Sequence, residues 1–421
     1  MNRSLNYDAV VLGAGVAGLS AGARLAEAGA KVCVVAKGYG STHLAPGTVD
    51  VLGYDPDRVE EPAGALPGFI AAHPEHPYAL LGAEAIAPAL EWFATKIERG
   101  PQPGYRYVGG LERNHLLPTA VGAVRPSALV PETMAAGDIR ERSAVCAVGL
   151  RALRDFYPSL CAGNLERAGL AARGIELDFD VGRPEANSLG LARRFDDPSF
   201  RGAFAARLVP RLRSGERVAL PAILGLMDPH GAWSDLERRL GHTVFEIPTL
   251  PPSASGMRVY NALTAALRAA GGRIVLGAEV LGVDREGERV SALRAHTSGH
   301  DTVYGARWVV LATGGLHSGA ITLSSDWSAR EMVAGLALHG MPADGEPRFT
   351  ADYFGEQPMS RVGIAVDSSL LAEGTENLFV AGAALPGAES WREGSGEGIA
   401  LASGHAVAQS ILEREGAKAA A

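Results

Sequence analysis

The sequence predicts an α/β fold in which two separated parts of the chain build a mostly parallel sheet and a second α/β lobe is inserted between them. A strand–helix–strand pattern with glycines at its first turn opens the chain over residues 9–38. Two later apolar runs, "VVLATGG" and "ENLFVAGAALPG", also end in glycine. A long stretch between them carries strand and helix patterns of its own.

Length and charge limit the class of protein. The 421 residues are enough for two lobes, and the net charge of −8 argues against a general nucleic-acid binder. No run of about twenty residues lacks glycine or charge, so we expect no direct transmembrane segment. The apolar start is interpreted as part of the fold rather than as an export signal. Three cysteines (Cys33, Cys146 and Cys161) lack pair spacing, which predicts no metal or iron–sulfur site and a cytoplasmic location.

The first unit has clear element boundaries. Residues 8–12 form a short apolar run typical of a buried strand. Residues 16–28 have helical character, and Gly29 is a natural stop after them. Residues 31–36 predict the second strand, which completes one β-α-β unit.

The middle of the chain departs from this domain. Residues 54–104 are rich in proline and glycine, with one helix expected over 83–98. "SAVCAVGLRALRDF" and "ERVALPAILGL" predict two strands that each run into a helix. A further helix is expected over 257–270, after the proline-rich "TLPPSASG".

The last third returns to the first domain. "GGRIVLGAEVLGVDREGERVSALRAH" predicts a strand and a hairpin with its turn near residues 285–288. A helix over 398–413 closes the chain. We therefore predict a Rossmann-like nucleotide domain with a β-meander over residues 1–55 and 270–421, and an inserted lobe facing substrate or partner over 56–269.

The opening glycines have the spacing of a nucleotide turn. Gly13 permits the tight turn, Gly15 lets backbone approach a phosphate, and Gly18 lets helix and strand pack closely. The helix that follows supplies unpaired N–H groups and a partial positive charge for an anion. The alternative is a turn that uses its glycines for packing alone.

The tip of the second strand lacks the usual carboxylate, because Ala36 and Lys37 stand there. Lys37 favours a phosphate over a ribose diol. Three ligands stay open on this ground: flavin mononucleotide, a dinucleotide without the ribose clamp, or NADP with its extra phosphate near Lys37. Lys37 as a solvated surface lysine is the alternative.

The later glycine motifs favour a flavin over a nicotinamide cofactor. The runs that contain Gly314, Gly315 and Gly382 resemble the later strand ends of glutathione-reductase-like and fumarate-reductase-like flavoproteins. Gly396 and Gly398 open the final helix, whose amino end points at the flavin ring in that class. Ala383 replaces a frequent acidic residue, so we expect FMN, with FAD as the alternative.

The loop "GSTHLAPGTVD" follows the second strand and resembles the segment that runs under the flavin in the fumarate-reductase group. Ser41 and Thr42 are candidate cofactor-binding residues. His43 is a candidate proton donor or covalent attachment point, and the alternative is a loop histidine that caps backbone.

Three arginines are candidates for binding an anionic substrate. Arg258 follows a proline-braced turn before a helix, Arg361 precedes "VGIAVD", and Arg392 lies in the loop before the final helix. We expect Arg258 and Arg392 to have catalytic roles. A surface or ion-paired arginine is the alternative for each.

The combination of motifs resembles the B-subunit family of anaerobic glycerol-3-phosphate dehydrogenase over nearly the whole chain. The resemblance is carried by "GAGVAGLSAG", the loop of residues 43–50, "HPYALLG", "TLPPSASGMRVYNAL", "VLATGG" and the block "ENLFVAGAALPG…GSGEGIALASGHAVAQSI". The "HPY" and "TLPP" blocks are the specific ones, because generic flavoproteins have no reason to carry them.

This resemblance implies a flavin subunit, usually described with FMN, of a three-part respiratory complex. The catalytic flavoprotein, or A subunit, oxidises sn-glycerol 3-phosphate to dihydroxyacetone phosphate, and the iron–sulfur, membrane-anchoring C subunit passes electrons to quinone. The chain would then lie on the inner face of the cytoplasmic membrane through its partners. A non-catalytic assembly role and a stand-alone NADP- or flavin-dependent oxidoreductase are the alternative functions.

Overall fold

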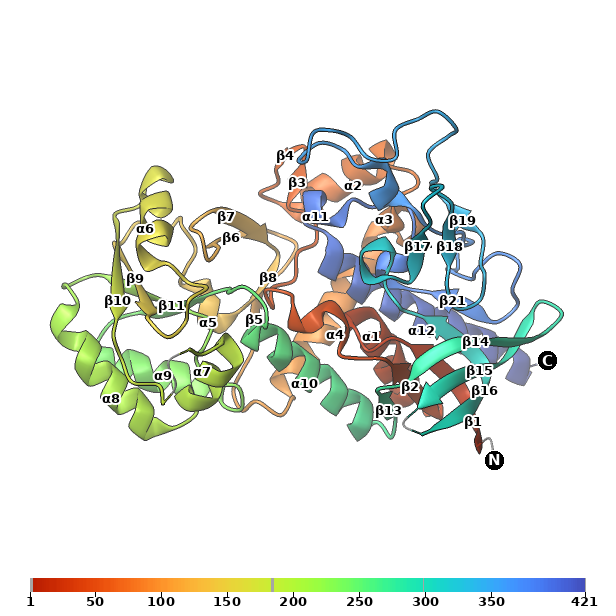
Figure 1. Cartoon of the computed structure of the whole chain (residues 1–421), viewed down its shortest axis with the longest axis horizontal. Helices are drawn as coiled ribbons and strands as arrows, with labels where there is room; N and C mark the ends of the chain where they lie inside the picture. The colour runs from red at the N-terminus through yellow and green to blue at the C-terminus, as the bar shows by residue number, and fades with distance from the viewer. Residues whose placement is uncertain (1–2, 183–184, 298, 421) are drawn as a thin grey trace.

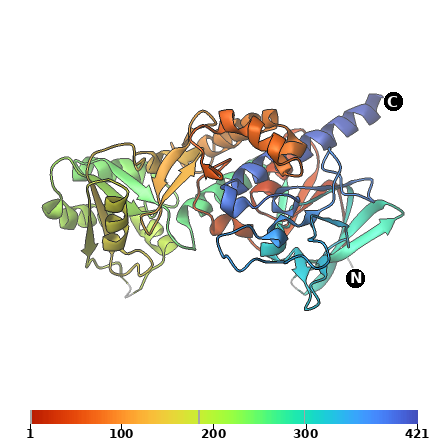
Figure 2. The same cartoon turned by 90° about the horizontal axis from the view of Figure 1, so that it is seen from above.

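The computed structural model describes residues 3–182, 185–297 and 299–420. The two lobes lie side by side along the longest axis, each around its own hydrophobic core (Figure 1). Figure 2, seen from above, shows the same separation, with the final helix extending from the larger lobe to the C-terminus. Within the described residues, no helix combines the length and apolar character needed to cross a membrane.

The larger lobe is built on a seven-stranded sheet in the order β13-β2-β1-β16-β15-β14, with β21 pairing on β16. Strands β13, β2, β1, β16 and β21 run parallel, and β14, β15 and β16 form an antiparallel meander. The strands are β1 (Arg3–Leu12), β2 (Val32–Ala36), β13 (Arg273–Leu276), β14 (Glu279–Glu286), β15 (Arg289–Thr297), β16 (His300–Leu311) and β21 (Leu378–Val380). The predicted α/β class, parallel sheet and meander are confirmed.

Helices cover this sheet because their small, apolar faces allow close approach. Helix α1 (Val16–Glu27) is buried along most of its length and packs against α12 (Gly396–Ala420) and α10 (Ala254–Ala269). Helices α2 (Pro62–Ala72), α3 (Pro77–Leu81) and α4 (Ile86–Glu98) also contribute to the larger core.

The smaller lobe has a parallel four-stranded sheet in the order β10-β9-β11-β12. Its core is a separate cluster of apolar side chains between Val145 and Ile247. Its elements are β9 (Val145–Leu150), α6 (Pro158–Arg167), β10 (Ala172–Leu177), α7 (Ser188–Phe195), α8 (Pro198–Leu208), β11 (Arg217–Pro221), α9 (Pro229–Leu240) and β12 (Val244–Ile247). The separate core supports the two-lobe division, whose boundaries stay a proposal.

Short elements connect the lobes and extend the larger one. They are β3 (Tyr54–Asp55), β4 (Asp57–Arg58), β5 (Tyr107–Gly109), β6 (His115–Pro118), β7 (Val124–Ser127), β8 (Leu129–Pro131), α5 (Glu132–Ala135), β17 (Ile321–Leu323), β18 (Ala329–Glu331), β19 (Leu338–His339), β20 (Gly363–Ile364) and α11 (Ser390–Glu393). Six short 3-10 helices complete the described elements: Gly40–His43, Ala83–Ala85, Val209–Arg211, Leu316–Ser318, Pro358–Arg361 and Gly382–Ala384.

The structure differs from the sequence expectation in the smaller lobe. "SAVCAVGLRALRDF" and "ERVALPAILGL" do not run from strand into helix. The strands end at Leu150 and Pro221, and the next helices begin at Pro158 and Pro229. Proline is favoured in the first turn of a helix, so it marks these starts better than the apolar run before them.

Candidate functional site

The first glycine turn lies between β1 and α1. Gly13 has φ +104°, and a Cβ at this position would overlap the carbonyl oxygen of Ala312. A Cβ at Gly18 would overlap the carbonyl oxygen of Gly13, whereas a Cβ at Gly15 would meet nothing within 4 Å. Gly13 and Gly18 therefore serve packing, and Gly15 faces open space.

The amino end of α1 is prepared for an anion. Gly15 is the N-cap residue, no described side chain caps the helix, and no acidic residue lies in its first turn. Its first N–H groups therefore lack a side-chain acceptor, and the helix dipole favours negative charge there.

The loop after β2 crosses this turn. Gly40 has φ +68°, and a Cβ there would lie 2.9 Å from the Cα and the nitrogen of Gly15. Thr42 is buried, and its Oγ1 has no hydrogen-bond partner. Nδ1 of His43 lies 2.7 Å from the carbonyl oxygen of Gly40, which matches the backbone-capping alternative for this nitrogen. Ser41 is exposed beside them.

The later glycine turns lie at the same end of the sheet, because β16 pairs parallel with β1 and β21 pairs parallel with β16. A Cβ at Gly315 would overlap the carbonyl oxygen of Ala383, and one at Gly382 would lie 2.9 Å from Cβ of Ala17 in α1. Gly314 has φ +78°, and the buried Oγ1 of Thr313 lacks a partner. The three glycine-bearing strand ends therefore meet, as expected for a ligand site of a parallel sheet.

The amino end of α12 is tied to the segment that follows the crossing loop. Gly398 donates its N–H to the carbonyl oxygen of Asp50 at 2.9 Å, and a Cβ on Gly398 would overlap the hydroxyl of Tyr78. That hydroxyl donates to Val51 at 2.8 Å. A Cβ on Gly396 would have Ser390 as its nearest neighbour, at 3.6 Å. Of these two glycines, only Gly398 is needed for the close contact between the start of α12 and Tyr78.

The "HPY" block braces the loop before α12. Nδ1 of buried His76 accepts the N–H of Tyr78 at 3.0 Å, so Nε2 carries the proton and donates to Glu393 at 3.2 Å. Burial would raise the pKa of Glu393, but hydrogen bonds from His76, Glu389 and Ser395 lower it. This block thus positions the start of the final helix.

A charged cluster that the sequence analysis missed lies beside the same helix end. Asp50 is buried and accepts from Arg125 Nε at 2.6 Å, Ser127 at 2.6 Å and Thr48 at 3.0 Å. Burial and the Asp50 charge raise the pKa of Glu397 to about 7, against the opposing effect of Arg125.

A match to a family model accompanies this geometry. The model described as "FAD binding domain" matches residues 8–399. The B subunit of anaerobic glycerol-3-phosphate dehydrogenase from Pectobacterium atrosepticum is 31% identical over 425 residues, covering 97% of this chain and 99% of the relative. The chain belongs to this family.

Further relatives and solved structures are similar over most of the chain. The probable B subunit of the same dehydrogenase from Halobacterium salinarum is 31% identical over 433 residues, with 97% and 99% of the two chains covered. A chain of Escherichia coli quinol fumarate reductase aligns with TM-score 0.47 and 12% identity, over 99% of this chain and 71% of that one. Mycobacterium smegmatis Sdh1 in complex with UQ1 aligns with TM-score 0.45 and 13% identity, over 98% and 69%.

This member of the B-subunit family fits a flavin at the convergent glycine turns. A phosphate-bearing cofactor would occupy the open space at Gly15 and accept hydrogen bonds from the uncapped N–H groups at the start of α1. It would also provide partners for the hydroxyls of Thr42 and Thr313, which have none in the protein. The preference for FMN has no support from the family match, which favours FAD. The missing acid at the tip of β2 therefore does not decide between the two flavins.

Lys37 is paired on the surface. Its Nζ lies 2.9 Å from Oε1 of Glu279 in β14, and both side chains are more than half exposed. Glu279 brings a carboxylate close to the end of β2, since neighbouring Ala278 donates to Ala36 at 3.1 Å. Lys37 is therefore ion-paired in this structure, and a phosphate-binding role for it stays a prediction.

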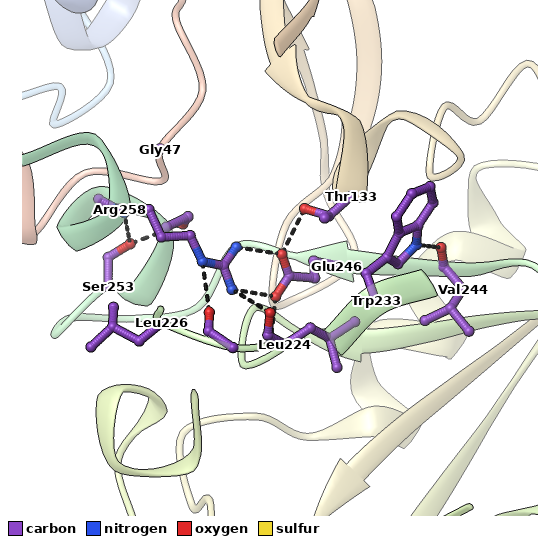
Figure 3. A network of polar contacts seen from close by, with 12 residues as sticks. Gly47, Thr133, Leu224, Leu226, Trp233, Val244, Glu246, Ser253 and Arg258 are labelled. Atoms are coloured by element: carbon purple, nitrogen blue, oxygen red, sulfur yellow. Dashed lines mark hydrogen bonds and ion pairs between the residues drawn. The ribbon is translucent and has the colours of Figure 1, made fainter. Parts of the chain in front are cut away.

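Arg258 corrects the expectation that it faces an anionic substrate. It is fully buried on α10, and its guanidinium donates to Glu246 of β12 at 2.7 and 2.9 Å and to Gly225 at 2.9 Å (Figure 3). Burial opposes the charged form, but Glu246 holds the pKa of Arg258 above its usual value. Its observed role is to join α10 to the smaller lobe.

Arg392 lies in α11, close to the final helix. Its Nη1 is 3.9 Å from Oε2 of Glu389, a buried carboxylate that also attracts Arg361 at 3.6 Å. Both arginines are therefore ion-paired in this structure. A substrate-facing role for Arg392 stays a proposal.

The "TLPPSASG" block packs on the crossing loop. Ser253 donates its N–H to His43 at 2.8 Å, and the Ser255 hydroxyl donates to Pro46 at 2.6 Å. A Cβ at Gly256 would overlap the carbonyl oxygen of Thr42. The block thus holds the loop against the glycine turn.

Within the described residues, no group of three or more histidines, cysteines, aspartates or glutamates could hold a metal ion. The three cysteines are buried and free.

Proposed function

We propose that this chain is the flavin-carrying subunit of a respiratory anaerobic glycerol-3-phosphate dehydrogenase, with FAD as its cofactor. The observation that carries the proposal is the convergence of the glycine turns at Gly15, Gly315 and Gly382 on one sheet edge. When bound, a flavin supplies a two-electron acceptor and donor. Membership of the B-subunit family supports the substrate and the complex.

The chain's own residues have binding and positioning roles in this proposal. The N–H groups at the start of α1 hold a phosphate, and Gly13 and Gly18 keep the strand ends close enough to shape the turn. Thr42 and Thr313 hold polar groups of the cofactor through their hydroxyls. The start of α12 favours negative charge on the bound ring.

Electrons would leave through a partner. The chain offers three buried, unpaired cysteines, which does not match the thiolate sets of iron–sulfur clusters. We therefore place it with the catalytic flavoprotein, or A subunit, and with the iron–sulfur C subunit that delivers electrons to quinone. This arrangement would put the chain on the inner face of the cytoplasmic membrane through its partners.

Co-purification tests the proposal. The chain is expressed with its natural neighbours, and cofactor and companions are identified together by mass spectrometry. We expect yellow protein that releases FAD and carries an iron–sulfur partner. A colourless chain that takes up neither FAD nor FMN would overturn the proposal.

A non-catalytic role in assembly is the second candidate. It is favoured by Ala36 and Ala383, which stand where flavoproteins often have acids. That candidate predicts that variants unable to bind flavin still assemble and leave quinone reduction unchanged. Loss of quinone reduction in an intact complex would exclude it.

A further inference from the structure

The tip of β2 lies against the first glycine turn. The N–H of Gly13 donates to the carbonyl oxygen of Val35 at 2.9 Å, and Ala36 follows as the last residue of the strand. The chain then returns to the turn at Gly40, where a Cβ would lie 2.9 Å from the backbone of Gly15. A dinucleotide with a phosphate at this turn would therefore have its adenosine ribose near the tip of β2.

The segment around this tip has no acid of its own. Residues 31–44 contain neither aspartate nor glutamate. Asp50, the next acid along the chain, is buried and accepts hydrogen bonds from Arg125 and Ser127. A carboxylate that binds a ribose at this tip would therefore have to come from another part of the chain.

Glu279 brings a carboxylate to this tip from β14. Strand β13 pairs in parallel with β2, and Leu276 lies opposite Ala36. The chain then turns, and the N–H of Ala278 donates to the carbonyl oxygen of Ala36 at 3.1 Å. Glu279 follows Ala278 directly and is the first residue of β14. Backbone pairing on both sides of the turn thus fixes Glu279 beside the end of β2.

Lys37 holds the Glu279 carboxylate in this position. Its Nζ lies 2.9 Å from Oε1 of Glu279, and the two side chains are 79% and 58% exposed. Among the described residues, no donor is bound to Oε2 of Glu279. An exposed ion pair of this kind contributes little to stability. It does leave an oriented carboxylate that faces solvent and has acceptor sites free for a hydroxyl group.

We propose that Glu279 is the residue that binds the adenosine ribose, in place of the acid that is missing at Ala36. The inference rests on the proposed function, in which FAD binds at the glycine turns. With the cofactor bound, the Glu279 carboxylate accepts a hydrogen bond from a ribose hydroxyl. Lys37 is a positioning residue, because it acts only through Glu279.

The same carboxylate determines which nucleotides the site prefers. FMN has no adenosine, so its affinity does not depend on Glu279. A 2′-phosphate on the ribose, as in NADP, would place a second negative charge close to the carboxylate, and like charges at short range repel. Glu279 therefore favours a dinucleotide whose ribose carries free hydroxyl groups.

Flavin titration of the full chain, stripped of cofactor, is the first test. Glu279→Gln removes the charge at nearly constant shape, and Glu286→Gln is the matched control, an exposed glutamate at the other end of β14. We expect Glu279→Gln to raise the Kd of FAD about tenfold, because a hydrogen bond to a charged acceptor is lost. The Kd of FMN should stay unchanged, which also shows that the variant is folded. Glu286→Gln should bind both flavins like the wild type.

A second measurement reads the charge of Glu279, which a purely structural role would not affect. AMP and adenosine 2′,5′-bisphosphate differ only in the 2′-phosphate, and their Kd values follow from displacement of FAD. We expect Glu279→Gln to shift the ratio of these Kd values toward the bisphosphate by about fivefold or more, because the repulsion is removed and Lys37 keeps its charge without a partner.

The outcomes separate this inference from the proposed function. Unchanged FAD affinity in Glu279→Gln would show an ordinary surface ion pair and overturn the inference, although flavin binding itself would stand. An unchanged ratio for AMP and the bisphosphate, or tighter binding of the bisphosphate by the wild type, would also overturn it. A wild type that binds neither FAD nor FMN would overturn the proposed function, and the inference with it.

Discussion

Gly256 of α10 lies so close to Thr42 that a Cβ on the glycine would overlap the threonine carbonyl oxygen. The contact joins two segments that are distant in sequence, the proline-braced helix start and the loop that crosses the glycine turn. Ser253 and Ser255 donate to the same loop. The position of the loop that carries Thr42 therefore depends on how closely α10 can approach.

Gly256→Ala is expected to displace this loop. Because the clash is with backbone, the cost should be about 1–3 kcal/mol of unfolding free energy, with weaker flavin binding. Gly163→Ala in α6 is the matched control, since a Cβ there meets nothing within 4 Å. Urea unfolding and flavin titration measure both effects. Equal behaviour of the two variants would contradict the tight contact.

Arg258→Met is expected to destabilise the protein by about 3–5 kcal/mol, because it leaves the buried Glu246 carboxylate without its cation. Arg238→Met removes an exposed partner of Asp235 and should cost less than about 1 kcal/mol. Denaturant unfolding of both variants checks the difference. Retained stability in Arg258→Met would show that the pair does not hold the lobes together.

His76→Ala is expected to destabilise the loop before α12 by about 1–3 kcal/mol at neutral pH, because the partly buried Glu393 loses a hydrogen-bond donor. The folded state lowers the pKa of Glu393, so this carboxylate stabilises the protein above its unfolded pKa and the contribution is lost on acidification. The difference between wild type and His76→Ala should therefore narrow below about pH 4.5. Unfolding curves at several pH values measure this difference, and a constant difference would argue against the hydrogen bond from His76 to Glu393.

Glu397 should make the stability of the protein fall as the pH rises. Its pKa is raised from 4.5 to about 7 on folding. Its contribution is therefore fully present below about pH 4.5 and lost by about pH 7. Glu397→Gln should remove this dependence and be more stable than wild type at pH 8 by about 2 kcal/mol, a value reduced for partial solvent screening. Thermal unfolding at pH 5 and 8 checks the sign, and lower stability of Glu397→Gln at pH 8 would contradict it.

The glycine turns could be predicted from the sequence because their signals are local. Gly13, Gly15 and Gly18 lie within a few residues of the end of β1 and the start of α1, and β16 and β21 are followed by similar glycine runs. The meander follows from the same apolar patterns, whereas the strand order comes from the structure. Two helices of the smaller lobe begin later than the sequence predicted, because their starts depend on Pro158 and Pro229 rather than on the preceding apolar residues.

The charged contacts could not be predicted, because they join residues far apart in the chain. Lys37 and Glu279 are separated by 242 residues, and His76 and Glu393 by 317. The ion pair of Arg258 could not be predicted either. A proline-braced turn predicts where the helix starts, but it carries no information about the lobe that buries the guanidinium.

Gly15→Val tests the central claim, that the glycine turn holds a flavin phosphate, most directly. Gly15 has φ −77° and open space around a Cβ, so valine fits the backbone and fills only the ligand's volume. We predict a folded chain with wild-type unfolding behaviour that purifies without FAD. Gly163→Ala is the folded control that should keep its flavin. A yellow Gly15→Val protein with wild-type FAD content would contradict the account.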